Sequence, residues 1–168
     1  SVTAPVSPIT FAGSGTAGVQ LGPDGTIYQT TSTGDATSGY TTTVTAISPI
    51  GTSATTTITG APVGGIKIAP DGATYQTTAT GDLSFIVDPD SYTTTVTAGT
   101  VSYTTAGAPR SGIQFGPDGT AYQTTYTGDG NGGYITTVIS ISPTQALPPI
   151  EAAGLPNSGV PIGPDGPV

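Results

Sequence analysis

The chain has 168 residues and a formal net charge of −8, from ten acidic and two basic side chains, so it would repel the phosphates of nucleic acids and of anionic membranes. Cysteine, methionine, tryptophan and histidine are absent, which excludes disulfides, thiol chemistry and most soft metal ligands. Glycine (26) and proline (16) are frequent and charged residues make up only 7%, a composition that disfavours amphipathic helices.

One eight-residue motif recurs along the chain at a fixed spacing. It reads GVQLGPDG from Gly18, GIKIAPDG from Gly65, GIQFGPDG from Gly112 and GVPIGPDG from Gly159, so successive copies start 47 residues apart. A fixed period of this length is the signature of a repeat architecture. We therefore divide the chain into the following segments: 1–17, aligned with the last strand of a preceding blade; repeats 18–64, 65–111 and 112–158; and 159–168, the start of a fourth repeat.

Each repeat begins with an apolar alternation, Val19 and Leu21 in the first, which predicts a short strand. The Pro-Asp-Gly that follows predicts a tight turn, because proline presets φ, aspartate caps the turn and glycine accepts a positive φ. A second strand is expected at about 28–32 and a second turn at Thr-Gly-Asp (33–35). The YTTTVT at 40–45 predicts a third strand of aromatic and β-branched residues.

A fourth strand is expected near 54–59 in the first repeat and near 101–105 in the second. In the third repeat Pro148 and Pro149 fall in this region and argue against a regular strand, because proline cannot donate to a sheet. The second repeat has a longer second turn, LSFIVDPDS at 83–91. We expect neighbouring repeats to contact each other through this loop.

Four short strands, three tight turns and a 47-residue period predict an all-β chain of antiparallel four-stranded blades, β-propeller-like in architecture. A closed propeller needs roughly four to eight blades, more than the chain supplies. Three alternatives stay open: a piece of a longer array, completion by oligomerisation through edge strands, and an open β-solenoid or fibre.

The first part of each unit, GIxhxPDGxhYxT with h an apolar residue, resembles the NHL repeats and related bacterial propeller repeats. In those repeats a glycine precedes the inner strand and Asp-Gly-x-x-Tyr begins the second strand. The resemblance implies a β-propeller-like fold. The chain differs by placing Gln29, Gln76 and Gln123 where such repeats carry an apolar residue.

Most carboxylates occupy repeated turn positions, namely Asp24, Asp71, Asp118 and Asp165 in the first turn and Asp35, Asp82 and Asp129 in the second. Such positions favour local hydrogen bonds over the facing pair of carboxylates that glycoside hydrolysis requires. A serine or threonine nucleophile also lacks a base, because the chain has no histidine or cysteine and a single lysine. We therefore expect a protein that is not an enzyme.

Two oxygen-rich loops are candidates for a Ca²⁺ site. Asp129-Gly-Asn131 resembles part of a calcium-binding ligand run, and Asp88-Pro-Asp90 supplies a second loop. The run lacks the late bidentate glutamate, and an ordinary glycine-rich turn explains the same residues. Beyond this possible Ca²⁺ we expect no cofactor.

A tyrosine and a glutamine open the YQTT motif of each repeat, at Tyr28–Gln29, Tyr75–Gln76 and Tyr122–Gln123. A ring of such groups could bind a sugar, because aromatic faces stack on sugars and amides bond their hydroxyls. In the alternative interpretation, which we favour, the tyrosines pack between neighbouring repeats and the glutamines satisfy backbone groups there.

These patterns predict a non-catalytic secreted or cell-surface module that acts as a scaffold or binds a protein or polysaccharide. Threonine-rich, lysine-poor acidic repeats are typical of bacterial surfaces, so we expect an extracellular or cell-envelope location. The alternative is a self-assembling structural protein that forms a closed oligomer or a filament by edge-strand pairing. No nucleic-acid partner and no membrane insertion are expected.

Overall fold

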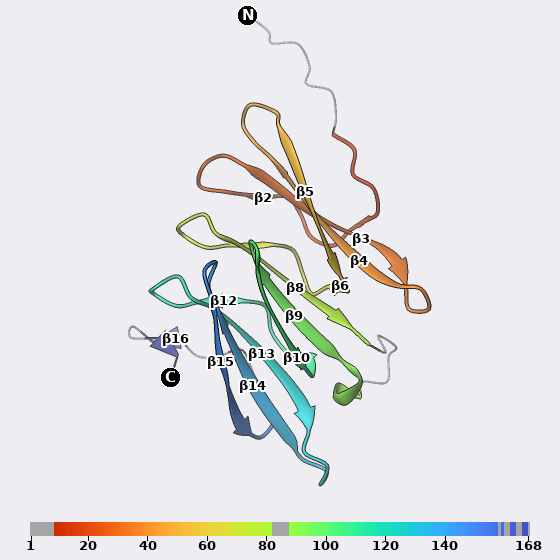
Figure 1. Ribbon diagram of the computed structural model, residues 1–168, viewed down its shortest axis with the longest axis vertical. Coiled ribbons are helices and arrows are strands. Elements are labelled where there is room, and N and C mark those ends of the chain that lie inside the picture. Colours follow the sequence, from red (N-terminus) through yellow and green to blue (C-terminus); the bar gives the residue numbers. More distant parts are fainter. Residues whose placement is uncertain (1–8, 82–87, 158, 160–161, 164–165, 168) are drawn as a thin grey trace, which may run out of the picture.

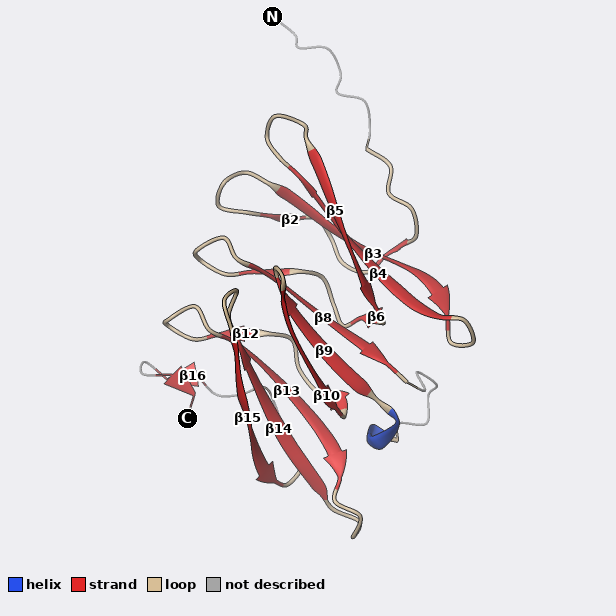
Figure 2. Ribbon diagram, in the orientation of Figure 1, coloured by secondary structure: helices blue, strands red, loops and turns tan. Residues whose placement is uncertain are grey.

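The computed structural model describes residues 9–81, 88–157, 159, 162–163 and 166–167. Three antiparallel sheets lie one above another along the longest axis of the molecule (Figure 1). Among the described residues the one helical element is a short 3-10 helix, η1 (Pro89–Ser91), visible beside the strands in Figure 2. The expected all-β fold of antiparallel sheets is confirmed. Within the same residues no helix has the length and apolar character needed to cross a membrane.

The three sheets share one strand order. Three long strands form a meander, and two short strands pair with the first long strand. In the first sheet these are β3 (Ile27–Asp35), β4 (Gly39–Ile47) and β5 (Ser53–Thr59), with β1 (Ser14–Gly15) and β2 (Gln20–Leu21). In the second they are β8 (Thr74–Thr80), β9 (Thr93–Ala98) and β10 (Val101–Ala106), with β6 (Ala61–Pro62) and β7 (Lys67–Ile68). In the third they are β13 (Ala121–Gly128), β14 (Tyr134–Ile141) and β15 (Ala146–Ala153), with β11 (Ala108–Pro109) and β12 (Gln114–Phe115). A hairpin of β16 (Ile162–Gly163) and β17 (Gly166–Pro167) follows.

The boundaries of the sheets differ from the repeat boundaries drawn from the sequence. We expected residues 1–17 to be the last strand of a preceding blade, yet β1 pairs with β3 of the sheet that follows it; residues 1–8 lie outside the described part. The boundary between the first and second sheets lies at Gly60, between β5 and β6, where the backbone φ is 108°. A side chain there would clash with the backbone oxygen of Ala79, so glycine allows the chain to pass from one sheet to the next.

The Pro-Asp-Gly turns of the first three repeats form as predicted; Asp165, in the fourth motif, lies outside the described residues. In the first repeat the Gly25 amide donates to the Gly22 carbonyl at 3.0 Å, and Gly25 has φ 82°. The prediction for the second turn is wrong in the first repeat, because β3 continues to Asp35 and the chain reverses at 36–38; in the second and third repeats the strands end within the motif, at Thr80 and Gly128. Gly34 pairs across the strands with Tyr40 and has no room for a Cβ atom against the Gly39 carbonyl. This glycine thus permits a close approach of two strands, which the sequence pattern does not distinguish from a turn.

The prediction that Pro148 and Pro149 argue against a regular strand is confirmed only in part, because a strand forms there but its register is irregular. Both lie within β15, an edge strand whose one partner among the described strands is β14. The register shifts between Val138 and Ser140, so the two prolines sit together in a β-bulge. Proline is tolerated at an edge and in a bulge because no ladder donor is needed there.

The apolar core lies between the second and third sheets. Tyr75 and Val96 from the second sheet meet Ile139 and Ile141 from the third, and all four side chains are fully buried. The first and second sheets meet around a cavity of about 60 Å³ lined by Val44, Ile66 and Gln76 among others. Because burying an isoleucine or a tyrosine stabilises the fold by about 1.5–3 kcal/mol, the two later sheets form the more stable part of the stack.

Candidate functional site: the repeated YQTT motif

Gln76, the glutamine of the second repeat, lies buried between the first and second sheets and is 2% exposed. Its Nε2 donates to the Gly64 carbonyl at 3.2 Å and to the Thr77 carbonyl at 2.8 Å. Its Oε1 accepts a hydrogen bond of 3.2 Å from the Thr30 hydroxyl of the first sheet. The amide group therefore has partners for its acceptor and its donors, as a buried polar group requires.

Gln123 repeats this arrangement one sheet further along the stack. It is fully buried, its Nε2 donates to the carbonyls of Ser111 (2.5 Å) and Thr124 (3.0 Å), and its Oε1 accepts from the Thr77 hydroxyl at 3.0 Å. We call this set of residues the glutamine–threonine ladder: Gln29, Thr30, Gln76, Thr77, Gln123 and Thr124. Its side-chain bonds join each sheet to the next.

Gln29 begins the ladder on the outer face of the first sheet and is only half-buried. Its Nε2 donates to the carbonyls of Ala17 and Thr30, both at 3.0 Å. Within the described part of the chain its Oε1 accepts no hydrogen bond. The three glutamines thus make the same donor contacts, and only those with a preceding sheet make the acceptor contact.

The ladder follows from the alternation of side chains along a strand. In the second motif Gln76 bonds to the preceding sheet, and the next residue, Thr77, bonds to the following sheet. Two adjacent residues therefore connect a sheet to both of its neighbours. This explains why the position carries glutamine instead of an apolar residue.

The motif tyrosines have different environments in the three sheets. Tyr75 is fully buried, its hydroxyl donates to the Gly119 carbonyl at 3.4 Å, and its ring meets Phe115 edge-on with centroids 5.3 Å apart. Burial raises the pKa of the Tyr75 phenol, and the nearby carboxylates of Asp71 and Asp118 add to this. Tyr28 and Tyr122 are half-buried. The contacts therefore match the packing interpretation of the motif, and the middle ring presents no free face to a sugar.

Thr30 and Thr77, whose hydroxyls bond to the glutamines, were not among the predicted site residues. A signal was available, since a threonine follows the glutamine in all three YQTT motifs. High β-propensity accounts for threonine in a strand, so the pattern alone did not point to a bond between sheets.

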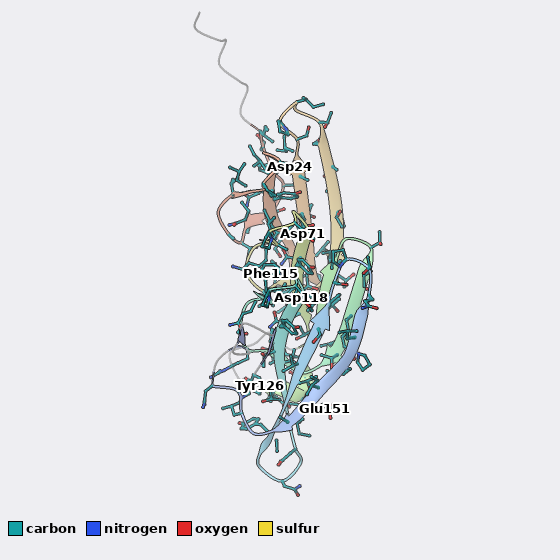
Figure 3. The ribbon with its side chains drawn as sticks, turned by 90° about the vertical axis from the view of Figure 1, so that its left-hand side faces the viewer. Asp24, Asp71, Phe115, Asp118, Tyr126 and Glu151 are labelled. Atoms are coloured by element: carbon teal, nitrogen blue, oxygen red, sulfur yellow. The ribbon has the colours of Figure 1, made fainter. Side chains whose placement is uncertain are left out.

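The carboxylates of the Pro-Asp-Gly turns follow one another along the stack at Asp24, Asp71 and Asp118 (Figure 3). Each caps its own turn, accepting from the backbone amide of Thr26 (2.9 Å), Ala73 (2.9 Å) or Thr120 (3.0 Å). Hydrogen bonds from the backbone and hydroxyl of Thr26 lower the pKa of Asp24, and those from Thr120 lower the pKa of Asp118. These aspartates therefore stabilise turns, as the sequence predicted.

The residues proposed for a Ca²⁺ site lie in two separate local caps. Asp129 Oδ1 accepts from the amides of Asn131 and Gly133, both at 2.8 Å, and these bonds lower the pKa of Asp129. Asp88 Oδ1 accepts from the amide of Asp90 at 3.1 Å and caps η1. Across the described ranges no three histidine, cysteine or acidic side chains cluster in a way that could hold a metal ion.

Asp90 joins the second repeat to the third. Its Oδ1 accepts a 2.6 Å hydrogen bond from the backbone amide of Gly128 at the end of β13. The expectation that neighbouring repeats meet through the longer loop of the second repeat is confirmed at its Asp90 end. Residues 82–87, which include Asp82 and most of LSFIVD, lie outside the described residues.

Replacing Asp90 by alanine should leave the Gly128 amide without this acceptor and lower the free energy of unfolding by about 0.5–1.5 kcal/mol. Amide hydrogen exchange measured by NMR should show faster exchange at Gly128. Asp90→Asn, which retains an acceptor oxygen, should change the exchange rate less. Equal exchange rates at Gly128 in Asp90→Ala and the unmodified protein would contradict the assigned bond.

The capped aspartates also predict the response to acid. Because the pKa values of Asp24, Asp35, Asp118 and Asp129 are lowered in the folded state, their stabilising effect is present above their unfolded pKa of about 3.9 and is lost as pH falls through the folded pKa. Denaturant unfolding should show constant stability between about pH 5 and 8, since the chain has no histidine, and a decrease below about pH 4. Stability that rises on acidification through this lower range would contradict the prediction.

No protein-family model matches the chain, and no curated protein is significantly similar to it in sequence. The resemblance to NHL repeats therefore stays a prediction from the motif.

Proposed function

We propose that the chain is a non-catalytic scaffold module of a secreted or cell-surface protein, in an extracellular or cell-envelope location. In this proposal the repeats stack as NHL-like, β-propeller-like blades and present their exposed turns and edge strands to a protein or a polysaccharide.

The observation that carries this proposal is the glutamine–threonine ladder. The side chains of Gln76 and Gln123 form hydrogen bonds that join one sheet to the next. The repeated aspartates Asp24, Asp71 and Asp118 bond within their own turns. The parts of the repeat that recur most regularly thus serve the rigidity of the stack, which is what a scaffold needs.

The exposed parts of the stack are polar and uncharged or acidic. The outer strand β5 is rich in exposed threonine, and the net charge of −8 comes from ten carboxylates against two cations. Such a surface favours hydroxyl-rich or cationic partners and disfavours polyanions.

Binding and turnover assays on the folded chain test this role. Glycan arrays and candidate surface proteins are probed with the unmodified chain and with the double variant Tyr28→Ala/Tyr122→Ala, which removes the two half-buried rings. We expect any binding to survive in the folded variant, because these rings serve packing. Saturable glycan binding lost only in the variant would restore the sugar-ring interpretation.

Incubating the folded chain with candidate substrates tests the absence of catalysis. Polysaccharide, ester and peptide substrates are expected to remain intact, with circular dichroism used to check that the protein is folded. Turnover that is abolished by one aspartate substitution, such as Asp118→Asn, would contradict the proposal.

Self-assembly is a second candidate, favoured by the apolar side chains of Val138 and Ile150 on the outer face of the third sheet, of which Ile150 is 64% exposed. Edge-strand pairing is one route to it, although the two prolines of β15 disfavour pairing along that edge.

A further inference from the structure

Thr124 closes the glutamine–threonine ladder on the outer face of the third sheet. It is 2% exposed, and its hydroxyl has no hydrogen-bond partner among the residues described. Its counterparts Thr30 and Thr77 both donate to the glutamine of the following sheet. A buried hydroxyl without a partner is unfavourable, and the two earlier sheets show which group satisfies it.

The same outer face carries apolar side chains at positions that form the core elsewhere in the stack. Val138 is half-buried and its cross-strand neighbour Ile150 is 64% exposed. In the second sheet the corresponding pair is Val96, fully buried, and Tyr103, packed against the core. We call this surface, with Thr124, Val138, Leu147 and Ile150, the trailing face. It is one half of the sheet–sheet interface that occurs twice within the molecule.

The outer face of the first sheet is the other half. Gln29 lies on it with an acceptor oxygen that takes no bond from the described residues, and a groove of about 330 Å³ runs over Thr31, Thr43, Thr45 and Thr55. The corresponding positions of the second and third sheets, Thr78 and Thr125 among them, are buried against the preceding sheet. We call this surface the leading face.

Short segments of the chain already lie where a neighbouring sheet would lie. Ile9 to Ala12 line the groove of the leading face, and they align with residues 150–153 three repeats later. Beyond the trailing face, the Arg110 side chain donates to the Pro156 carbonyl at 3.2 Å, and Gly159 lies close to Gln114. Since GVPIGPDG from Gly159 matches GVQLGPDG from Gly18, the same segments of a second copy can displace these segments and take their places.

We propose that copies of this chain associate head to tail, with the leading face of one copy on the trailing face of the next. In this arrangement the Thr124 hydroxyl of one copy donates to Gln29 Oε1 of the second copy, which continues the ladder. This inference deepens the proposed scaffold role by naming a second copy as a partner. Because the two faces differ, the association is heterologous and extends to longer assemblies instead of stopping at a dimer.

Sedimentation equilibrium of the full chain over a range of concentrations tests the association. The weight-average mass of the unmodified chain should rise above the 16.3 kDa of one copy as concentration increases. Val138→Asp places a negative charge on the trailing face and Thr43→Asp places one on the leading face, so each variant alone should stay at 16.3 kDa. Thr37→Asp, in the exposed turn after β3, is the control and should associate like the unmodified chain.

Mixing the two blocked variants distinguishes head-to-tail stacking from other modes. Each retains one intact face, so an equimolar mixture should form dimers and nothing larger. A chain that stays monomeric at all concentrations, a Val138→Asp variant that still associates alone, or a mixture that does not form dimers would each overturn the proposal. None of these results bears on the binding and turnover assays, which test the scaffold role separately.

Replacing one threonine hydroxyl at a time tests the proposed bond itself. Thr124→Val should weaken association by about three- to tenfold while leaving the thermal midpoint of the monomer unchanged or higher, because it removes an unpartnered buried hydroxyl. Thr77→Val, which removes a hydroxyl bonded to Gln123, should lower the thermal midpoint. Unchanged association in Thr124→Val would overturn the assigned contact.

Discussion

Replacing Gln76 by leucine is expected to lower the free energy of unfolding by about 2–4 kcal/mol, a large fraction of the stability of a domain of this size. The substitution removes three hydrogen bonds and leaves the Gly64 carbonyl without the side-chain donor it has now. Leucine has a similar volume, so the loss reports the polar contacts more than a cavity. Denaturant unfolding followed by circular dichroism measures it.

Gln29→Leu is the matched control for this prediction. Gln29 makes the same two donor bonds but is half-buried and lacks the acceptor bond within the described residues. Its replacement should cost less than about 1 kcal/mol, because water reaches the groups that lose their partner. If Gln76→Leu were as mild as the control, or stabilising, the buried amide would not hold the sheets together.

Replacing Ile139 by alanine is expected to cost about 2–5 kcal/mol. Ile139 is fully buried in the core between the second and third sheets, together with Tyr75 and Val96, so the substitution leaves a cavity as well as less buried apolar surface. The corresponding residue on the leading face, Thr45, is half-buried at the surface groove, and Thr45→Ala should change stability by less than about 1 kcal/mol. Thermal and denaturant unfolding of both variants measure the difference. Similar losses in the two variants would contradict the placement of the core between the later sheets.

The local features of the fold were predictable because their causes are local. Proline, aspartate and glycine in sequence specify a turn through φ preferences and one side-chain hydrogen bond, and the structure has this turn at residues 22–25 with Asp24 as its cap. The alternation of Val19 and Leu21 was sufficient to predict the short strand that the structure places at Gln20–Leu21.

The errors came from residues whose role depends on a neighbouring strand. Gly34 belongs to a strand because its partner approaches closely across the ladder, and this approach is invisible in a sequence window. Pro148 and Pro149 are tolerated because β15 is an edge strand with a bulge. Strand position within a sheet is set by the whole repeat, so single-residue propensities do not determine it.

The ladder itself was predictable only in part. The regular recurrence of YQTT suggested that the glutamines satisfy backbone groups between repeats, and the bond from Gln76 to Gly64 has this character. The bond to Thr30 joins residues that are 46 positions apart. It exists only because whole sheets stack with a fixed offset, which hydrophobic periodicity does not encode.

Hydrogen exchange at the glutamine side-chain amides, followed by NMR, shows whether the glutamine–threonine ladder joins the sheets. If Gln76 and Gln123 join the sheets, their Nε2 protons should exchange at least about tenfold more slowly than those of the exposed Gln145, because exchange then requires the sheets to separate. Exchange of Gln76 and Gln123 at the rate of Gln145 would show that the repeated glutamines are open to solvent and would contradict the account.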